Sequence, residues 1–260
     1  MKIASWNVNS LKVRLPQVLD WINLNQPDVL CLQETKQNND NFPHDVFEKR
    51  GLFSYHNGQN TYNGVAIISN KELIDVQFDI PNFYDEQKRL ISGIYPNDED
   101  PKFRVISAYI PNGQSLNSDK FEYKMNWLKS FINFLQTKID GIENIITGDF
   151  NIAPTTLDCY DSKSWDGKIL VSPQEREYFD KLLNLGFIDT FREMNPNANE
   201  FSWWDYRIPF KRNLGMRIDH ILLSKTLLPF LKKAYIDKAT RTLERPSDHV
   251  PVVTELSLNP

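Results

Sequence analysis

Four polar clusters stand at the ends of otherwise apolar segments, and they hold the residues whose types could carry chemistry. Residues 5–9 (Ser-Trp-Asn-Val-Asn) place two amides at the end of an opening apolar run, and residues 32–36 (Leu-Gln-Glu-Thr-Lys) place a carboxylate after another. Residues 145–151 end in Gly-Asp-Phe-Asn, and residues 245–252 contain an Asp-His pair before a last apolar run. Taken singly, each cluster is also typical of a strand that ends in a turn.

The third and fourth clusters contain the pairs with the clearest chemical meaning. Asp149 and Asn151 lie two residues apart and point to the same side if the strand continues, while Gly148 permits a close backbone approach. A carboxylate beside an amide suits a phosphoryl group or a hydrated cation, because the carboxylate accepts a proton and the amide donates to a non-bridging oxygen. In the fourth cluster, Asp248 can bind a metal while His249 contacts a phosphate or transfers a proton.

Taken jointly, the clusters and one further aspartate supply carboxylate, amide and imidazole groups without a cysteine pattern. The set comprises Asn7, Asn9, Glu34, Asp149, Asn151, Asp219, Asp248 and His249. Such groups suit a hard cation, Mg²⁺ or Mn²⁺, better than they suit a structural zinc ion. The reaction class that follows is metal-assisted phosphoryl transfer.

Short strand-like runs and a few amphipathic helices must position these clusters. Strands are predicted at residues 2–8, 29–33, 64–69, 90–94, 104–110, 144–148, 218–223, 234–239 and 252–258. Helices are predicted at residues 15–24, 119–138 and 173–186, and loops at residues 79–87, 95–102, 111–118 and 154–168. Because many strands follow one another without an intervening helix, two packed mixed sheets with helices outside fit better than one doubly wound sheet.

Length and composition indicate a single α/β domain over residues 1–260. Apolar residues make up 40% and charged residues 25% of the chain, which is typical of a globular protein and excludes a disordered or fibrous one. Two cysteines are too few for a disulfide framework, and no run reaches the roughly 18 apolar residues of a membrane span. We therefore expect a cytoplasmic protein with no membrane segment. The net charge of −4 argues weakly against a nucleic-acid partner, unless some carboxylates hold a cation.

Several motifs, in the order in which they occur, resemble the exonuclease III family of DNA-repair endonucleases. They are the clusters above together with Pro-Asp-Val at 27–29, Tyr-Ile-Pro-Asn-Gly at 109–113, Phe-Ser-Trp at 201–203 and Arg-Ile-Asp at 217–219. The similarity runs from residue 2 to residue 256. The Gly-Asp-Phe-Asn and Ser-Asp-His motifs alone would indicate only the wider endonuclease/exonuclease/phosphatase superfamily. The resemblance implies a four-layered α/β sandwich, in agreement with the two predicted sheets.

The resemblance also implies roles for individual residues. Glu34 would be the principal Mg²⁺ carboxylate, Asn7 and Asp248 would support the metal and its waters, and Mn²⁺ could replace Mg²⁺. Further candidate metal ligands are Asp149, Asn151 and His249.

The catalytic assignments follow from the same resemblance. Asp149 would orient and deprotonate the attacking water, and Asp219 would orient and polarise His249. Asn151, His249 and Tyr109 would stabilise charge on the phosphate. These assignments agree with the needs of phosphodiester cleavage, which requires donors at the non-bridging oxygens and an aligned nucleophile.

Contacts to DNA should come from basic, amide and aromatic residues around that site. The predicted DNA-binding residues are Arg89, Asn112, Lys120, Trp203, Arg207 and Met216. Lys124 could also grip a phosphate, although a solvated surface lysine is the commoner case. Trp203 and Met216, near Asp219, could line a pocket for a sugar that lacks its base. At least one of the tryptophans at positions 203 and 204 is expected in the core.

Four positions depart from the family pattern. Ser10 stands where glycine is usual, which questions the geometry of the turn, and Asn9 replaces an aspartate of some relatives. His220 follows Asp219 where an apolar residue or tyrosine is common, and the sequence offers no account of it. Met216 lacks the indole that some relatives place in the pocket.

The leading hypothesis is a monomeric Mg²⁺-dependent DNA repair hydrolase that acts on double-stranded DNA with abasic sites or blocked 3′ ends. It would cut the phosphodiester 5′ to an abasic site, clean 3′ ends and show some 3′→5′ exonuclease activity. Two alternatives stay open at this point: a phosphodiesterase or phosphatase of the same superfamily acting on a lipid or inositol phosphate, and a non-catalytic DNA-binding module.

Overall fold

The computed structural model describes residues 1–96 and 103–257, and in these ranges the chain forms two six-stranded mixed sheets. In the first sheet, β1 and β2 are parallel and the other neighbours are antiparallel. Its strand order is β11 (Leu231–Ile236), β12 (Val252–Leu256), β1 (Lys2–Asn7), β2 (Val29–Gln33), β4 (Val65–Ser69) and β3 (Phe53–Asn57).

The second sheet repeats this plan, with β7 and β8 as its parallel pair. Its strand order is β5 (Ile74–Phe78), β6 (Leu90–Tyr95), β7 (Phe103–Tyr109), β8 (Glu143–Asp149), β10 (Asp219–Ser224) and β9 (Phe187–Asp189). Each sheet therefore has one parallel pair of strands at its centre and antiparallel pairs on either side. The parallel pair needs a long crossover connection, which here contains a helix.

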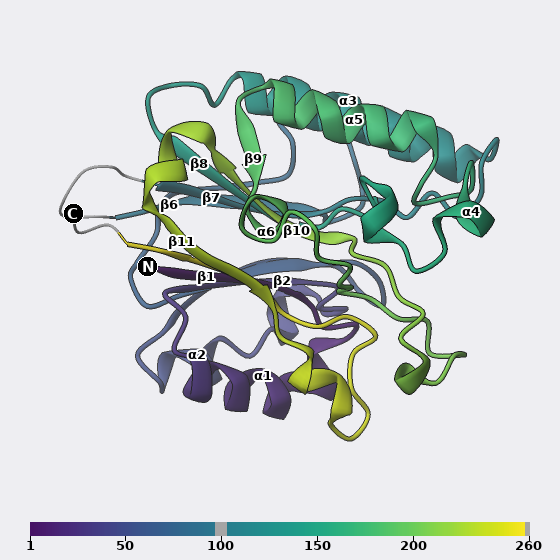
Figure 1. Cartoon of the computed structure of the whole chain (residues 1–260). Coiled ribbons are helices and arrows are strands. Elements are labelled where there is room, and N and C mark those ends of the chain that lie inside the picture. The colour runs from purple at the N-terminus through teal and green to yellow at the C-terminus, as the bar shows by residue number, and fades with distance from the viewer. Residues whose placement is uncertain (97–102, 258–260) are drawn as a thin grey trace.

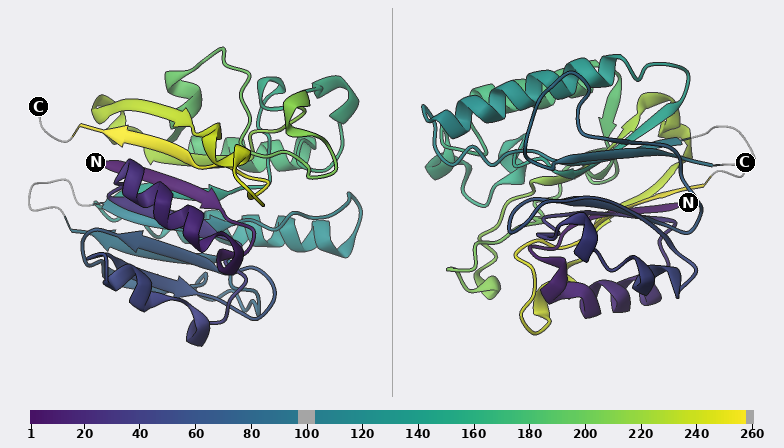
Figure 2. Two further views of the ribbon diagram at one scale, coloured as in Figure 1. Left: turned by 90° about the horizontal axis from the view of Figure 1, so that it is seen from below. Right: turned by 180° about the vertical axis from the view of Figure 1, so that it is seen from behind.

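Helices cover the outer face of each sheet, which gives four layers (Figure 1). Helices α1 (Leu11–Asn25) and α2 (His44–Glu48) lie on the first sheet, and α3 (Asp119–Gln136) and α5 (Pro173–Asn184) lie on the second. The view from behind shows the same order of layers (right panel of Figure 2). Two short helices, α4 (Ser162–Trp165) and α6 (Thr190–Met194), lie in the connections. The predicted four-layered α/β sandwich is confirmed.

The central strands are apolar on both faces because each sheet is buried on both faces. In β2, Val29 and Cys31 belong to the core between the sheets, whereas Leu30 packs toward α1. In β8, Ile145 faces the other sheet and Ile146 faces α3 and α5. Successive side chains of a strand thus point alternately into the core between the sheets and into the core under the helices. Because both cores are apolar, the strand sequence is a continuous apolar run.

The structure corrects some predicted boundaries. Strands β3, β5 and β9 were not predicted, and β11 ends at Ile236 instead of reaching residue 239. The chain leaves β11 because Asp237 accepts a hydrogen bond from Ala239 N and begins a 3₁₀ turn. The predicted loop at 154–168 contains a 3₁₀ turn and α4. Residues 97–102 of another predicted loop and residue 258 of the last predicted strand lie outside the described residues.

Among the described helices, none is both long enough and apolar enough to span a membrane.

Candidate active site

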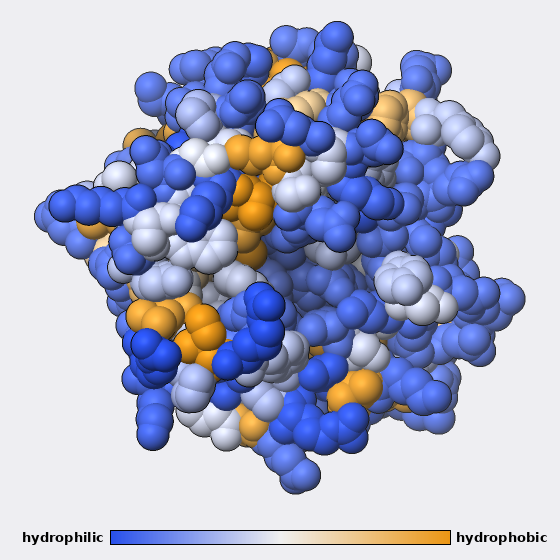
Figure 3. Space-filling view, turned by 90° about the vertical axis from the view of Figure 1, so that its right-hand side faces the viewer, coloured by the Kyte–Doolittle hydropathy of each residue, from blue (hydrophilic) through white to orange (hydrophobic). Residues whose placement is uncertain are grey.

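The topology brings the four polar clusters to one edge of the sandwich. The parallel strands β1 and β2 end at Asn7 and Gln33, and the parallel strands β7 and β8 end at Tyr109 and Asp149. The strands β10 and β12 run antiparallel to their neighbours and therefore start at this edge, so Asp219 pairs with Asp149. In Figure 3 this end of the molecule faces the viewer, and its centre is hollowed and mostly hydrophilic.

Unusual backbone conformations gather at the same edge. Ser10, Glu34 and Asn151 have φ angles of 91°, 51° and 51°, which non-glycine residues adopt at a cost of about 1–3 kcal/mol. A Cβ on Gly148 would collide with the carbonyl oxygen of Ala108, so glycine is required where β8 approaches β7. At Ser10, where the family resemblance led us to expect glycine, the positive φ is a conformation that glycine adopts more readily than serine.

Glu34, which directly follows β2 of the first sheet, contacts three other side chains of the site. Its Oε1 accepts hydrogen bonds from Asn7 Nδ2 at 2.9 Å and from the Tyr109 hydroxyl at 2.8 Å, and its Oε2 pairs with Lys36 Nζ at 2.9 Å. Burial would raise the pKa of Glu34, but Lys36 and the Asn7 amide outweigh burial and lower it. Burial and the Glu34 charge raise the pKa of Tyr109 well above its usual value, so the phenol stays protonated.

Asn7 joins Glu34 to the second half of the site. Its Nδ2 also donates to Asp149 Oδ2 at 2.9 Å, so one amide group contacts a carboxylate in each sheet. Asp149 is 1% exposed, and the backbone N–H of Asn151 donates to its Oδ1 at 2.9 Å. Burial, opposed by His249 and reinforced by Asp219, raises the pKa of Asp149 to about 7.

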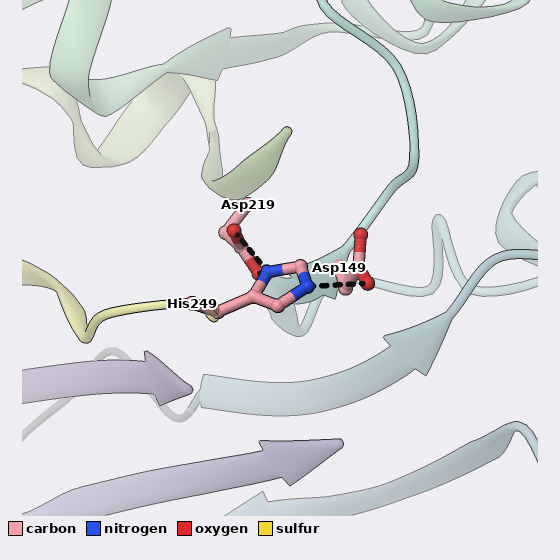
Figure 4. Close-up of side chains that lie close together, drawn as sticks. All are labelled: Asp149, Asp219 and His249. Carbon is pink, nitrogen blue, oxygen red and sulfur yellow. Dashed lines mark hydrogen bonds and ion pairs between the residues drawn. The ribbon is translucent and has the colours of Figure 1, made fainter. Parts of the chain in front are cut away.

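The imidazole of His249 lies between two aspartates (Figure 4). Its Nδ1 lies 2.9 Å from Asp219 Oδ2, and its Nε2 lies 3.8 Å from Asp149 Oδ2. Burial alone would lower the pKa of His249, but Asp219 and Asp149 raise it to about 10. The ring is therefore a cation at neutral pH, with Asp219 held in place by the Ser202 hydroxyl, which donates to Asp219 Oδ2 at 2.6 Å.

A second line of contacts connects Glu34 with Asp248. Lys36 Nζ donates to Asn9 Oδ1 at 2.6 Å, and Asn9 Nδ2 donates to Asp248 Oδ1 at 2.9 Å. The indole N–H of Trp203 donates to the other oxygen, Asp248 Oδ2, at 3.0 Å. The structure thus places Asp248 in the same network as Glu34, with Asn9 between them.

The residues of this network fit a hard divalent cation. Their donor groups are carboxylate and amide oxygens, which Mg²⁺ and Mn²⁺ prefer. The network contains four carboxyl groups and two cationic side chains, and a divalent cation would offset this excess of acidic groups. The carboxylates are those of Glu34, Asp149, Asp219 and Asp248, and the cations are Lys36 and His249.

Asp149, Asp219 and His249 also lie close enough together to resemble a metal site, with ligand atoms within 4.8 Å of one another. Both ring nitrogens of His249 face carboxylates, however, and a protonated ring has no lone pair for a metal. The geometry thus argues against the predicted metal contact of His249 and favours the oxygen groups around Glu34. The side chain of Asn151 also has protein partners at both of its polar atoms, because its Nδ2 donates to Ile110 O and its Oδ1 accepts from Asn112.

The predicted DNA contacts divide into accessible and buried residues. Asn112, Lys120 and Arg207 are exposed, and Trp203 is half-buried beside His249, with its ring centre 6.4 Å from the imidazole. Trp204 is 1% exposed, as expected for the member of the pair that belongs to the core.

Met216 and Arg89 do not have the surroundings predicted for them. Met216 is fully buried in a cluster with Cys159, Leu170 and Ile218, so its side chain cannot contact DNA in this structure. Arg89 is 8% exposed and donates to Tyr109 O, Gln87 and the Tyr123 hydroxyl, so its guanidinium is committed to the protein.

Sequence analysis missed the supporting roles of Lys36 and Ser202, and it did not predict the buried position of Lys124. Lys36 pairs with Glu34, and its position two residues later in the same polar motif was the available signal. Ser202 directly precedes Trp203 and fixes Asp219. Lys124 is fully buried instead of solvated, and its Nζ donates to Asn151 O at 2.7 Å while it pairs with Glu175.

Comparison with known proteins places this geometry among nucleases. The family described as "Endonuclease/Exonuclease/phosphatase family" matches residues 4–249. Exodeoxyribonuclease III of Haemophilus influenzae is 36% identical over 98% of this chain and 99% of its own, and DNA repair nuclease APEX1 of Danio rerio is 32% identical over 99% of this chain and 83% of its own.

Solved structures give the same picture. The 3′ phosphatase NExo from Neisseria, bound to a product DNA hairpin, has a TM-score of 0.95 and 43% identity, with 99% of each chain covered. An AP endonuclease from Archaeoglobus fulgidus has a TM-score of 0.94 and 34% identity over 99% of this chain and 100% of its own.

Proposed function

Because the chain belongs to the endonuclease/exonuclease/phosphatase family, we propose that it cuts the DNA phosphodiester 5′ to abasic sites, removes blocking groups from 3′ ends and degrades 3′ ends as an exonuclease. At the level that its relatives share, the protein is a DNA repair nuclease and a metal-dependent phosphodiesterase. The division of activity among the three DNA reactions is the part that belongs to the proposal.

Asp149 has the properties of the group that takes the proton from the attacking water. It is buried at the end of β8, and its pKa of about 7 is close to the value at which a general base is most effective at neutral pH. Its two oxygens are held by Asn7 and by the backbone of Asn151, so the carboxylate has a fixed orientation. Fixed geometry of this kind supplies much of the rate enhancement in displacement reactions.

His249 supplies positive charge where a phosphate would gain negative charge. Asp219 keeps the imidazole protonated and oriented, as in other sites where a carboxylate holds a histidine. The hydroxyl of Tyr109, which now donates to Glu34, is a further donor at the edge of the site. Donors that are fixed before the reaction stabilise developing charge at no cost of reorganisation.

Glu34 would hold the divalent cation, with Asn7 and Asp248 supporting it. When bound, Mg²⁺ or Mn²⁺ would act as a Lewis acid and neutralise charge on the phosphoryl group. Asn112, which donates to Asn151, and Trp203, which donates to Asp248, adjoin the site and would contact the DNA backbone or the sugar. The exposed Lys120 and Arg207 stay predicted DNA contacts. A monomer in the cytoplasm stays our prediction for the state in which the enzyme works.

The observation that carries the proposal is the convergence of Glu34, Asp149, Asp219 and His249 at one edge, through Asn7. The test uses the purified protein with Mg²⁺ and three duplexes: one with an internal abasic analogue, one with a 3′ phosphate and one with an unmodified recessed 3′ end. Product from the abasic duplex with a new 3′ hydroxyl is expected, with smaller yields from the other two.

The Asp149→Asn variant serves as the matched control, because it keeps the shape of the side chain but removes the base. It should bind DNA and lose turnover, whereas a non-catalytic DNA-binding protein would be indifferent to the change. Intact DNA in all three reactions at micromolar wild-type enzyme would refute the proposal.

A further inference from the structure

His220 takes no part in the chemistry above, yet it is buried directly behind the site. It follows Asp219 in β10 and pairs with Gly148 of β8, so its side chain points to the opposite face of the sheet from Asp219. There the imidazole packs edge-on against Phe150 and Phe179, with ring centres 5.2 and 4.9 Å away, and it is 1% exposed.

The neighbours of the ring fix its protonation state. Its Nε2 lies 2.9 Å from the carbonyl oxygen of Ile152, which can only accept, so Nε2 carries a hydrogen. Its Nδ1 lies 3.0 Å from Nη1 of Arg217, which can only donate, so Nδ1 is an acceptor. His220 is therefore a neutral imidazole that donates to Ile152 O. Burial and the Arg217 charge lower its pKa to about 4, which agrees with this assignment.

Ile152 O is one of three successive carbonyls that receive side-chain hydrogen bonds. Lys124 Nζ, from α3, donates to Asn151 O at 2.7 Å, and Arg176 Nε, from α5, donates to Ala153 O at 3.2 Å. Three donors on three different elements thus fix the segment 151–153, and His220 is the donor that belongs to the same strand as Asp219.

The position of this segment matters because the backbone of Asn151 orients Asp149. Asn151 adopts a left-handed φ of 51°, and in this conformation its N–H donates to Asp149 Oδ1 at 2.9 Å. A segment released at Ile152 would leave the turn free to relax and the carboxylate free to rotate. We propose that His220 is a positioning residue that holds the Asn151–Ile152 backbone in place and thereby sets the orientation of Asp149.

This inference rests on the proposed function, and its test uses variants that separate the hydrogen bond from the packing. His220→Phe keeps an aromatic ring between Phe150 and Phe179 but leaves Ile152 O without its donor. In His220→Gln, the side-chain amide N–H can occupy the position of the histidine Nε2 and donate to Ile152 O. In His220→Asn, the side chain is too short for its amide to reach Ile152 O. Leu222→Ala removes buried volume two residues further along the same strand, in the core that includes Phe179.

Cleavage of the abasic duplex with Mg²⁺ is measured for each variant, well below its unfolding temperature. We expect kcat of His220→Phe and His220→Asn to fall on the order of 10–100-fold with KM changed less than threefold, since misplaced groups slow chemistry more than they weaken binding. His220→Gln should recover most of kcat, and Leu222→Ala should keep kcat while losing stability.

Wild-type kcat in His220→Phe, an equal loss in His220→Gln and His220→Asn, or an equal loss in Leu222→Ala would each overturn the inference. If His220→Phe does not fold, the comparison of the glutamine and asparagine variants decides the question alone. Failure of the wild-type protein to cleave any duplex would instead count against the proposed function.

Discussion

Replacing Asp219 by asparagine should lower the pKa of His249 and weaken its positive charge without changing the shape of the site. Asp219 lies 2.9 Å from His249 Nδ1 and is the strongest of the groups that favour the protonated ring. The rise of the His249 pKa from 6.5 to about 10 corresponds to roughly 5 kcal/mol of preference for the cation. Burial opposes this preference, so without Asp219 the pKa of His249 should fall, and the charged fraction of the ring at pH 7.5 should drop even though Asp149 still favours the cation.

The expected loss in kcat for Asp219→Asn is about 10²–10³-fold, the usual cost of removing one fixed donor from a site that stabilises an oxyanion. The pH dependence should change as well. In the wild type, activity should rise as Asp149 loses its proton near pH 7 and should fall as His249 loses its proton near pH 10. In the variant the loss of activity at high pH should begin at a lower pH, because His249 loses its proton earlier.

The assay is single-turnover cleavage of the abasic duplex between pH 6 and pH 10.5. Asp28→Asn is the matched control, because Asp28 lies far from the site, at the other end of the strands of the first sheet. There its Oδ2 accepts a hydrogen bond from Lys2 N at 2.6 Å. The control should keep wild-type rates at every pH. An Asp219→Asn variant with a wild-type rate and an unchanged alkaline limb would refute the assigned role of His249.

Three further predictions follow from charges that the fold holds in place. Glu34→Gln should raise the Mg²⁺ concentration for half-maximal cleavage by about tenfold, because the principal carboxylate of the cation site loses its charge; an unchanged Mg²⁺ titration would contradict this. Arg217→Met should lower the free energy of unfolding by about 3–5 kcal/mol, since it removes the guanidinium that pairs with the buried Asp189 and leaves Asp158 with Arg192 alone, and a urea titration in which the variant matches the wild type would exclude this role. Burial and the nearby His44 lower the pKa of His56 to about 3, so the unfolded chain binds the proton first and stability falls as the pH drops from 6.5 toward 3. Between pH 7.5 and 4.5 the wild type should therefore lose about 2–3 kcal/mol more than His56→Phe, measured by urea unfolding.

The central strands could be predicted from the sequence because they are buried on both faces. β2 coincides with the predicted run, and β4, β6, β7, β8 and β10 agree with theirs to within one or two residues at each end. The strands that escaped prediction lie at sheet edges, where one side has no neighbouring strand: β3 and β5 carry exposed and half-buried residues, and β9 has three residues. Their sequences resemble loops because an edge strand with an open face needs few apolar side chains.

The site could be predicted as a set of residues but not as a set of contacts. Polar groups at the ends of apolar runs were visible, and the alternation of strands implied that these ends share an edge. Burial of Met216, Arg89 and Lys124 was not visible, because it depends on segments distant in sequence that pack against them after folding, such as α5 against Lys124 and α3 against Arg89. A lysine with Glu175 as a buried partner has the same sequence signature as a lysine in water.

The two halves of the site lie in different sheets, and this arrangement links activity to the packing between the sheets. Asn7 and Glu34 extend from the first sheet, Asp149 and Asp219 belong to the second, and His249 precedes β12 of the first. The hydrogen bond from Asn7 Nδ2 to Asp149 Oδ2 and the pairing of His249 with Asp219 both cross that interface. Each half alone lacks either the proposed base or the cation that faces it. The central apolar core therefore does more than stabilise the fold, since it brings the proposed base to the groups that orient it.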